Sequence, residues 1–165
     1  MRTVFRITAP ILCMCAALLS LVARADDEAA VSEKLGRIIK ETKLRHRDIE
    51  HFFVVEVRMS TGYLQEVFVT KQAHFLGEEP FVEITAVGWR WENATEFSRQ
   101  NANWLLEAST TTKVGGWQAL KFEDENSVAA EFKATIPLDS RPQTFEAVIK
   151  GVASSAFELH DLMDE

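Results

Sequence analysis

Cysteine is nearly absent from this chain of 165 residues: its two cysteines, Cys13 and Cys15, both lie among the first 25 residues. Because that segment is expected to be removed, the mature chain has no thiol. The class of small secreted domains held together by disulfides is therefore excluded. Thiol nucleophiles and cysteine-ligated metal sites are excluded for the same reason.

Basic stripes and glycine-rich phosphate loops are also lacking. The Gly115-Gly116 pair follows a predicted helix and indicates a turn. The chain has 18 Lys and Arg against 25 Asp and Glu, and loss of Arg2, Arg6 and Arg24 leaves 15 against 25, a net charge of −10. An acidic domain without a basic stripe is poorly suited to bind nucleic acid or an anionic membrane surface, because phosphate contact needs Lys and Arg clustered on one side. We expect neither partner.

Catalytic and metal-binding motifs are missing as well. The histidines His46, His51, His74 and His160 form no compact ligand spacing. His46 and His51 flank the entry to the first predicted strand and would share a metal only if that connection folded back on itself. No serine stands in a nucleophile elbow. We expect no catalytic residue, metal or cofactor, although the plentiful acidic residues leave a carboxylate pair open.

The first 25 residues have the pattern of a secretory signal peptide. Arg2 and Arg6 precede an apolar run over residues 9–22, and Ala23-Arg24-Ala25 fits the small-x-small cleavage rule. The alternative is a retained signal anchor, but the run is shorter than the ~20 residues that a membrane span needs. We expect cleavage before Asp26, no stable membrane anchor afterwards, and a periplasmic or secreted protein.

Hydrophobic periodicity predicts a single domain over residues 26–165. Three helices are predicted, over residues 31–44, over residues 93–108, and from Asp139 or Ser140 towards the C-terminus. Five strands are predicted, over residues 52–59, 63–70, 81–91, 116–123 and 128–136. The order α-β-β-β-α-β-β-α indicates an α+β fold, with one five-stranded, mainly antiparallel sheet and helices packed on one face.

The central predicted helix, residues 93–108, lies between strands on both sides. Phe97, Trp104 and Leu105 recur at the spacing of one helical face. Asn93 is a favoured N-cap residue, and Glu96 three positions later completes a sequence typical of a capping box. The β-branched residues and Gly-Gly pair that follow are expected to end this helix.

The first predicted helix and its end carry a basic segment in an otherwise acidic protein. Its members are Lys34, Arg37, Lys40, Lys43, Arg45 and Arg47. One interpretation is the solvated face of an amphipathic helix, whose last turn favours cations. The other is a docking patch for an acidic partner.

Three tryptophans suggest a binding surface. By strict alternation, Trp89 and Trp91 point to the face of the third strand opposite Val82, Ile84 and Ala86, and Trp117 on the fourth strand is a candidate neighbour. We expect these three aromatic side chains on the outer face of the sheet. Either a loop or the first helix covers them, or they form a dimer or client-protein interface.

Three stretches resemble the YbjN-like proteins of the type III secretion chaperone-like superfamily. They are residues 63–69, residues 103–106 with the Gly-Gly pair that follows, and residues 136–139 with the C-terminal helix. The resemblance covers most of the mature chain and implies a chaperone-like fold that binds partner proteins, often as a dimer, without enzymatic activity. These motifs specify a fold more strongly than a function.

The expected function is therefore that of an exported, non-enzymatic protein-binding domain. Its partner is another protein or a second copy of the chain, with Trp89, Trp91 and Trp117 at the interface. The alternative is a small periplasmic hydrolase or ligand-binding protein with a carboxylate-lined pocket. An enclosed pocket with converging Asp, Glu or His favours the alternative, and an aromatic sheet face favours protein binding.

Overall fold

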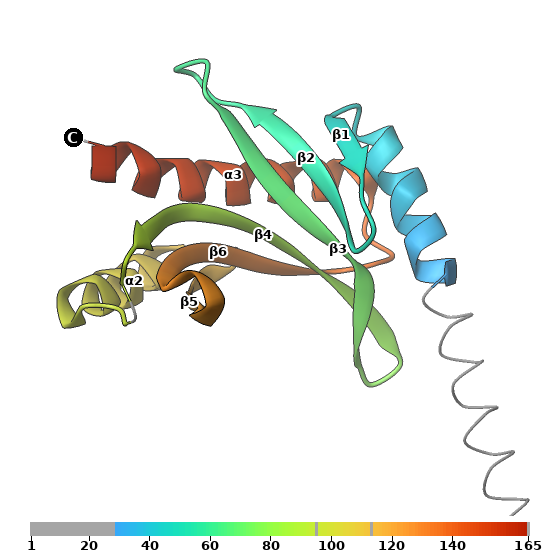
Figure 1. Cartoon of the computed structure of the whole chain (residues 1–165). Coiled ribbons are helices and arrows are strands. Elements are labelled where there is room, and N and C mark those ends of the chain that lie inside the picture. The colour runs from blue at the N-terminus through green and yellow to red at the C-terminus, as the bar shows by residue number, and fades with distance from the viewer. Residues whose placement is uncertain (1–28, 95, 113, 165) are drawn as a thin grey trace, which may run out of the picture.

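The computed structural model describes residues 29–94, 96–112 and 114–164 of the chain, so the predicted signal peptide lies outside the described residues. A helix over residues 29–41 comes first. The elements that follow are β1 (Arg45–Asp48), β2 (Phe52–Arg58), β3 (Leu64–Leu76), β4 (Glu79–Glu92), α2 (Arg99–Thr111), β5 (Gly116–Phe122), a 3-10 turn η1 (Glu123–Glu125), β6 (Ser127–Pro137) and α3 (Pro142–Asp164) (Figure 1).

The strands form one antiparallel sheet in the order β1-β2-β3-β4-β6-β5. The α+β class with a single antiparallel sheet is confirmed, but the prediction of five strands is wrong because the sheet has six. The additional strand is β1, which pairs with β2 from Arg45 opposite Glu56 to Asp48 opposite Phe53. It was missed because its sequence, Arg-His-Arg-Asp, is charged and mostly exposed, without the apolar alternation of a half-buried strand.

The strands predicted over residues 52–59 and 63–70 are present as the hairpin of β2 and β3, with Phe53 opposite Val69 and Val57 opposite Gln65. The next hairpin is longer than predicted. Residues 71–80 lie between two of the predicted strands, but they extend β3 to Leu76 and start β4 at Glu79. These additional residues pair with each other at a solvent-exposed tip. Because neither face is buried there, the sequence shows no apolar alternation that would predict a strand.

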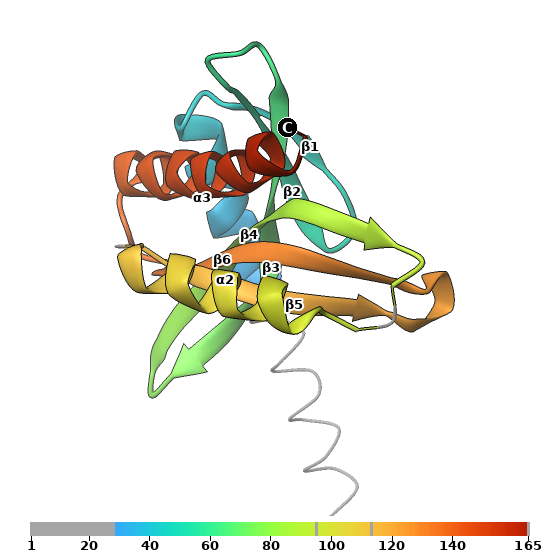
Figure 2. The ribbon, with the colours of Figure 1, turned by 90° about the vertical axis from the view of Figure 1, so that its left-hand side faces the viewer.

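The main core lies between the sheet and two helices, the helix over residues 29–41 and α3, which lie on the same side of the sheet in Figure 2. Alternate residues of β2, β3, β4 and β6 point into it, as the period of two predicts. Its largest fully buried side chains include Phe132, Phe145, Leu35, Ile39, Ile84 and Ile149. Burial of each such side chain stabilises the fold by about 1.5–3 kcal/mol relative to exposure.

The central helix begins later than its sequence suggests. α2 starts at Arg99, and the N-cap is Ser98, whose hydroxyl accepts a hydrogen bond from the Asn101 backbone amide at 3.1 Å. Asn93 instead has a φ of 57° in the connection after β4, so it does not cap the helix. Asparagine suits both a cap and a left-handed turn, and composition alone does not separate the two.

A smaller apolar cluster joins α2 to the rest of the fold. Leu105 of α2, Ala130 of β6 and Leu159 of α3 form its buried centre. Five half-buried aromatic side chains pack around them: Trp89, Trp91, Phe97, Trp104 and Trp117. The cluster places α2 over the β5 end of the sheet (Figure 2).

The last helix, α3, has Pro142 in its first turn, where proline is tolerated, and runs for 23 residues beneath the sheet. None of the helices in the described ranges combines the length and the apolar character needed to span a membrane.

Candidate functional site

The feature that stands out on the sheet is a fork between β3 and β4. The two strands pair from Phe68 opposite Thr85 to Leu76 opposite Glu79. Beyond Phe68 they separate: residues 64–67 pair with β2, and residues 86–92 pair with β6. Within the described chain, neither segment has a strand partner on the side that faces the fork.

The fork has a local cause in β4. The register of β4 against β6 shifts between Val87 and Trp89, which is the mark of a β-bulge. A bulge bends its strand and increases the local twist. Here it coincides with the point at which β4 leaves β3, and Gly88 at the bulge lets the ring of Trp117 lie against the backbone.

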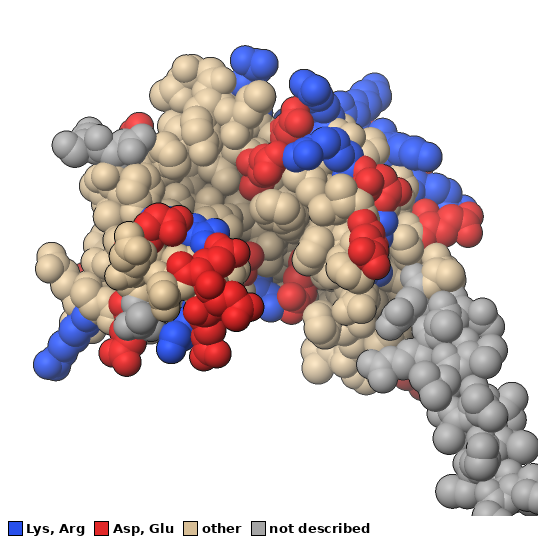
Figure 3. All heavy atoms as spheres, in the orientation of Figure 1, with Lys and Arg blue, Asp and Glu red and all other residues tan. Residues whose placement is uncertain are grey.

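An open cleft of about 650 Å³ lies in the fork between the two strands. One wall is residues 63–66 at the start of β3, and the other is residues 87–90 of β4. Glu56 and Phe68 also line it, and His160 of α3 closes part of its floor. Figure 3 shows this side of the molecule hollowed between a lobe formed by β2 and β3 and a lobe formed by β4 and β6.

Aromatic rings line the end of the cleft that lies over α3. The ring of His160 lies 4.7 Å from that of Tyr63 and 5.6 Å from that of Trp89, measured between centroids. Phe157, one turn earlier on α3, lies 5.5 Å from Tyr63. The histidine thus connects an aromatic residue of one wall to an aromatic residue of the other. Tyr63 is still 40% exposed, so its ring is available to a ligand.

Gln65 is the polar residue buried at the fork. Its side chain is only 5% exposed, and its Nε2 donates to the carbonyl oxygens of Val87 and Glu66, each at 3.2 Å. A side-chain amide therefore spans the gap that a backbone ladder would otherwise close. The Oε1 atom of Gln65 is buried and has no hydrogen-bond partner among the described residues. An unsatisfied buried acceptor of this kind costs about 1–3 kcal/mol.

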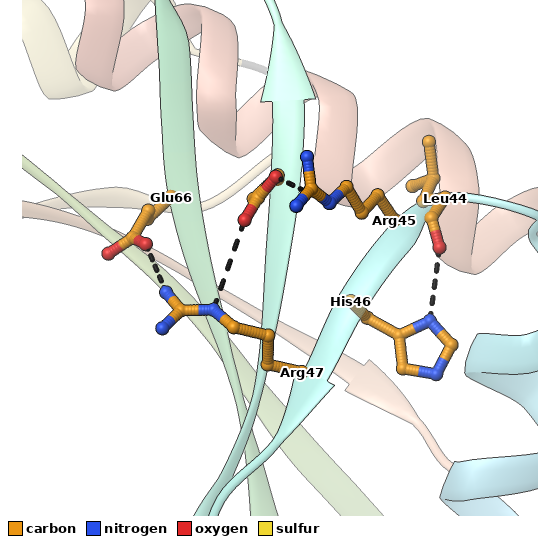
Figure 4. Close-up of polar contacts among 6 residues, drawn as sticks. Leu44, Arg45, His46, Arg47 and Glu66 are labelled. Carbon is orange, nitrogen blue, oxygen red and sulfur yellow. Dashed lines mark hydrogen bonds and ion pairs between the residues drawn. The ribbon is translucent and has the colours of Figure 1, made fainter.

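Two carboxylates line the cleft, but both are engaged by arginines of β1. Glu56 and Glu66 are direct cross-strand neighbours. Arg45 Nε lies 3.2 Å from Glu56 and Arg47 Nε lies 3.9 Å from it, while Arg47 also bonds to Glu66. Figure 4 shows Arg47 reaching to both carboxylates; the unlabelled side chain is Glu56. Part of the basic segment thus neutralises a like-charged pair.

Loss of Arg47 is therefore expected to destabilise the fold modestly. Arg47→Ala leaves Glu56 and Glu66 as opposed like charges, and we expect the free energy of unfolding to fall by about 0.5–1 kcal/mol at low salt. Urea denaturation measures it. The loss should shrink in 1 M NaCl, where the Debye length is about 3 Å. Arg58→Ala is the control because Arg58 faces the apolar Leu64 in the register. Equal losses for both variants contradict this role of Arg47.

The predicted placement of the tryptophans on the outer face is wrong. Trp89 is opposite Ala130, Trp91 is opposite Val128 and Trp117 is opposite Phe132, so all three pack with the cluster around α2 and α3. The bulge inserts one residue and moves Trp89 and Trp91 to the same face as Ala86.

The three tryptophans have different surroundings. Trp89 lines the cleft. Trp91 packs on Phe97 at 5.2 Å and lines a smaller hollow of about 200 Å³ between α2 and α3. Trp117 packs edge-on against Phe132 at 5.2 Å and lies 6.1 Å from Trp104. The structure therefore brings only one of the three into the cleft.

The residues that sequence reasoning missed are Tyr63, Gln65 and His160. Gln65 did carry a signal, because it shares its face of β3 with the buried Val67 and Val69. A polar side chain that points into the core needs a hydrogen-bond partner or has a functional role there. His160 carried no comparable signal, since its neighbours in the cleft come from strands about 70 and 100 residues earlier in the chain.

The other histidines lie apart from the cleft lining. His46 Nδ1 lies 3.0 Å from the Leu44 carbonyl oxygen, and His51 lies 3.8 Å from Glu50 (Figure 4 shows the former). Across the described ranges, no group of three His, Cys, Asp or Glu side chains is arranged to hold a metal ion.

Comparison with known proteins adds no relative to this picture: no family model matches the chain, and no curated protein matches it.

Proposed function

We propose that this protein is an exported, non-enzymatic binding protein whose cleft between β3 and β4 holds part of another polypeptide. The observation that carries the proposal is the cleft itself, with unpaired strand edges on both sides and aromatic rings at its floor. Interfaces between proteins are enriched in tyrosine and tryptophan. The resemblance to YbjN-like proteins supports the same class of function.

A small periplasmic hydrolase or ligand-binding protein is the second candidate. It is favoured by Glu56, Glu66 and His160, which all line the cleft. Against it, both carboxylates are held by arginines, and the cleft is an open groove instead of an enclosed cavity. A general acid or base needs a carboxylate that is free to reach the substrate. The protein-binding function accounts for more of the geometry.

Substitution of Tyr63, an aromatic residue of the cleft wall, tests this function. A phage-displayed library of random twelve-residue peptides is selected on the purified protein, and the affinity of a selected peptide is measured by fluorescence anisotropy. Tyr63→Ala is expected to weaken binding by about tenfold or more, as for an aromatic residue at the centre of an interface. Phe75→Ala is the matched control because Phe75 is 58% exposed at the distant hairpin tip.

Three results would contradict the proposal. One is failure to select any peptide, and another is an equal loss of affinity in Tyr63→Ala and Phe75→Ala. The third is loss of binding when either carboxylate is neutralised, and it separates the two candidate functions. We expect Glu56→Gln and Glu66→Gln to leave peptide affinity within about twofold, because arginines already pair with these carboxylates. Loss of all binding in either variant would favour the carboxylate-based site.

A further inference from the structure

The two edges of the fork are suited to bind a strand. Residues 64–67 of β3 and residues 86–92 of β4 each pair with a neighbour on one side only. Such an edge presents unpaired backbone N–H and C=O groups, which an extended peptide can use. Exposed edges usually occur at the ends of a sheet, whereas these two face each other within it.

Gln65 indicates which hydrogen-bonding group a ligand at the fork would supply. Its Nε2 already satisfies the Val87 carbonyl, so part of the β4 edge is paired by a side chain in place of a strand. Its buried Oε1 still requires a donor. A backbone N–H is the donor that any extended peptide presents regardless of its sequence. The orphaned acceptor therefore indicates a ligand with an N–H group.

The residues that line the cleft indicate which kind of side chain the bound peptide would place there. Tyr63 and Trp89 stand on opposite walls with His160 between them, and Leu64, Phe68 and Val87 add further apolar surface. The carboxylates of Glu56 and Glu66 are already paired with arginines. Burial of an apolar or aromatic side chain is therefore favoured here over that of a cation.

We propose that the partner segment binds as an extended strand in the fork between β3 and β4. One of its backbone N–H groups donates to Gln65 Oε1, and an apolar side chain packs against Tyr63, Trp89 and His160. This inference rests on the proposed function and specifies the conformation and chemistry of the partner. The segment would pair with one of the two edges of the fork and so become an additional strand within the sheet.

A scan of backbone N-methylation tests the strand geometry on the unmodified protein. A peptide selected from the phage library is synthesised with one amide nitrogen methylated at a time. In a strand paired on one edge, successive N–H groups point alternately towards and away from that edge. We expect methylation to weaken binding by about tenfold or more at alternate positions and to have little effect between them.

Gln65→Met tests the assigned acceptor. Methionine keeps the length of the side chain and removes its amide, so peptide affinity is expected to fall by about fivefold, the value of one hydrogen bond. Gln72→Met is the matched control, since Gln72 is exposed on the same strand. Circular dichroism verifies that both variants fold.

The outcomes separate the two proposals. Affinity that depends on Tyr63 but shows no alternation with N-methylation overturns the strand geometry and leaves the proposed function standing. Equal affinities of the Gln65→Met and Gln72→Met variants overturn the role of Gln65. Failure to select any peptide overturns both the inference and the function on which it rests.

Discussion

Replacing Phe132 by alanine is expected to lower the free energy of unfolding by about 3–5 kcal/mol. The phenyl ring is 1% exposed, belongs to the main core and packs edge-on against Trp117 at 5.2 Å. Trp117 in turn packs against both apolar clusters. Truncation leaves a cavity that rigid strands on either side close poorly. Chemical denaturation monitored by tryptophan fluorescence measures the loss.

Phe75→Ala is the matched control for this change. The same atoms are removed, but Phe75 is 58% exposed at the tip of the β3–β4 hairpin. The free energy of unfolding is therefore expected to change by less than about 0.5 kcal/mol. A loss below about 1 kcal/mol for Phe132→Ala would contradict the position of Phe132 between the clusters.

Adding one methyl group at Gly88 is expected to lower the free energy of unfolding by about 1–3 kcal/mol. A Cβ at this position would lie 2.7 Å from Cη2 of Trp117 and 3.1 Å from the Ala156 carbonyl oxygen. Neither the ring nor the α3 backbone can yield without disturbing the bulge. Denaturation measures the stability, and near-ultraviolet circular dichroism reports the displacement of Trp117.

Gly151→Ala should have the opposite sign. Gly151 lies on α3, is exposed, and a Cβ there meets nothing within 4 Å. Alanine in a helix interior is favoured over glycine by about 0.8–1 kcal/mol, so this variant is expected to be more stable than the parent protein. If both substitutions stabilise the protein, the close packing of Trp117 on Gly88 is wrong.

Residue alternation predicted most of the sheet because burial on one face imposes a period of two. The β2–β3 hairpin and β6 lie where the apolar pattern placed them. The same pattern cannot locate a strand whose residues stay in water. β1 escaped prediction for that reason, although it supplies Arg45 and Arg47 to the carboxylates of the cleft.

The bulge explains why the aromatic face was assigned to the wrong side. Alternation assumes that every residue advances the strand by one position, and one additional residue near Gly88 reverses the facing of everything after it. Trp89 and Trp91 were therefore placed opposite to where they lie. Glycine within a strand does indicate a bulge, but Gly88 alone does not tell how many side chains change face.

The cleft depends on contacts that no local pattern encodes. Tyr63 of the β2–β3 turn, Trp89 of β4 and His160 of α3 meet only because α3 crosses beneath the point at which β3 and β4 separate. Sequence reasoning proposed a protein-binding class, which stays a prediction, and named Trp89, which lines the cleft. It could not assemble the site, since the separation of the strands is a property of the whole twisted sheet.

Amide hydrogen exchange with and without a selected peptide is the most direct test of peptide binding between β3 and β4. Residues 64–67 and 86–92 border the fork, so peptide binding is expected to slow exchange at alternate amides of one of these two segments, while the hairpin tip around Gly77 is unchanged. Slowed exchange confined to the hollow between α2 and α3, lined by Trp91 and Trp104, would contradict the account. It would place the binding site on the helices and not in the cleft of the sheet.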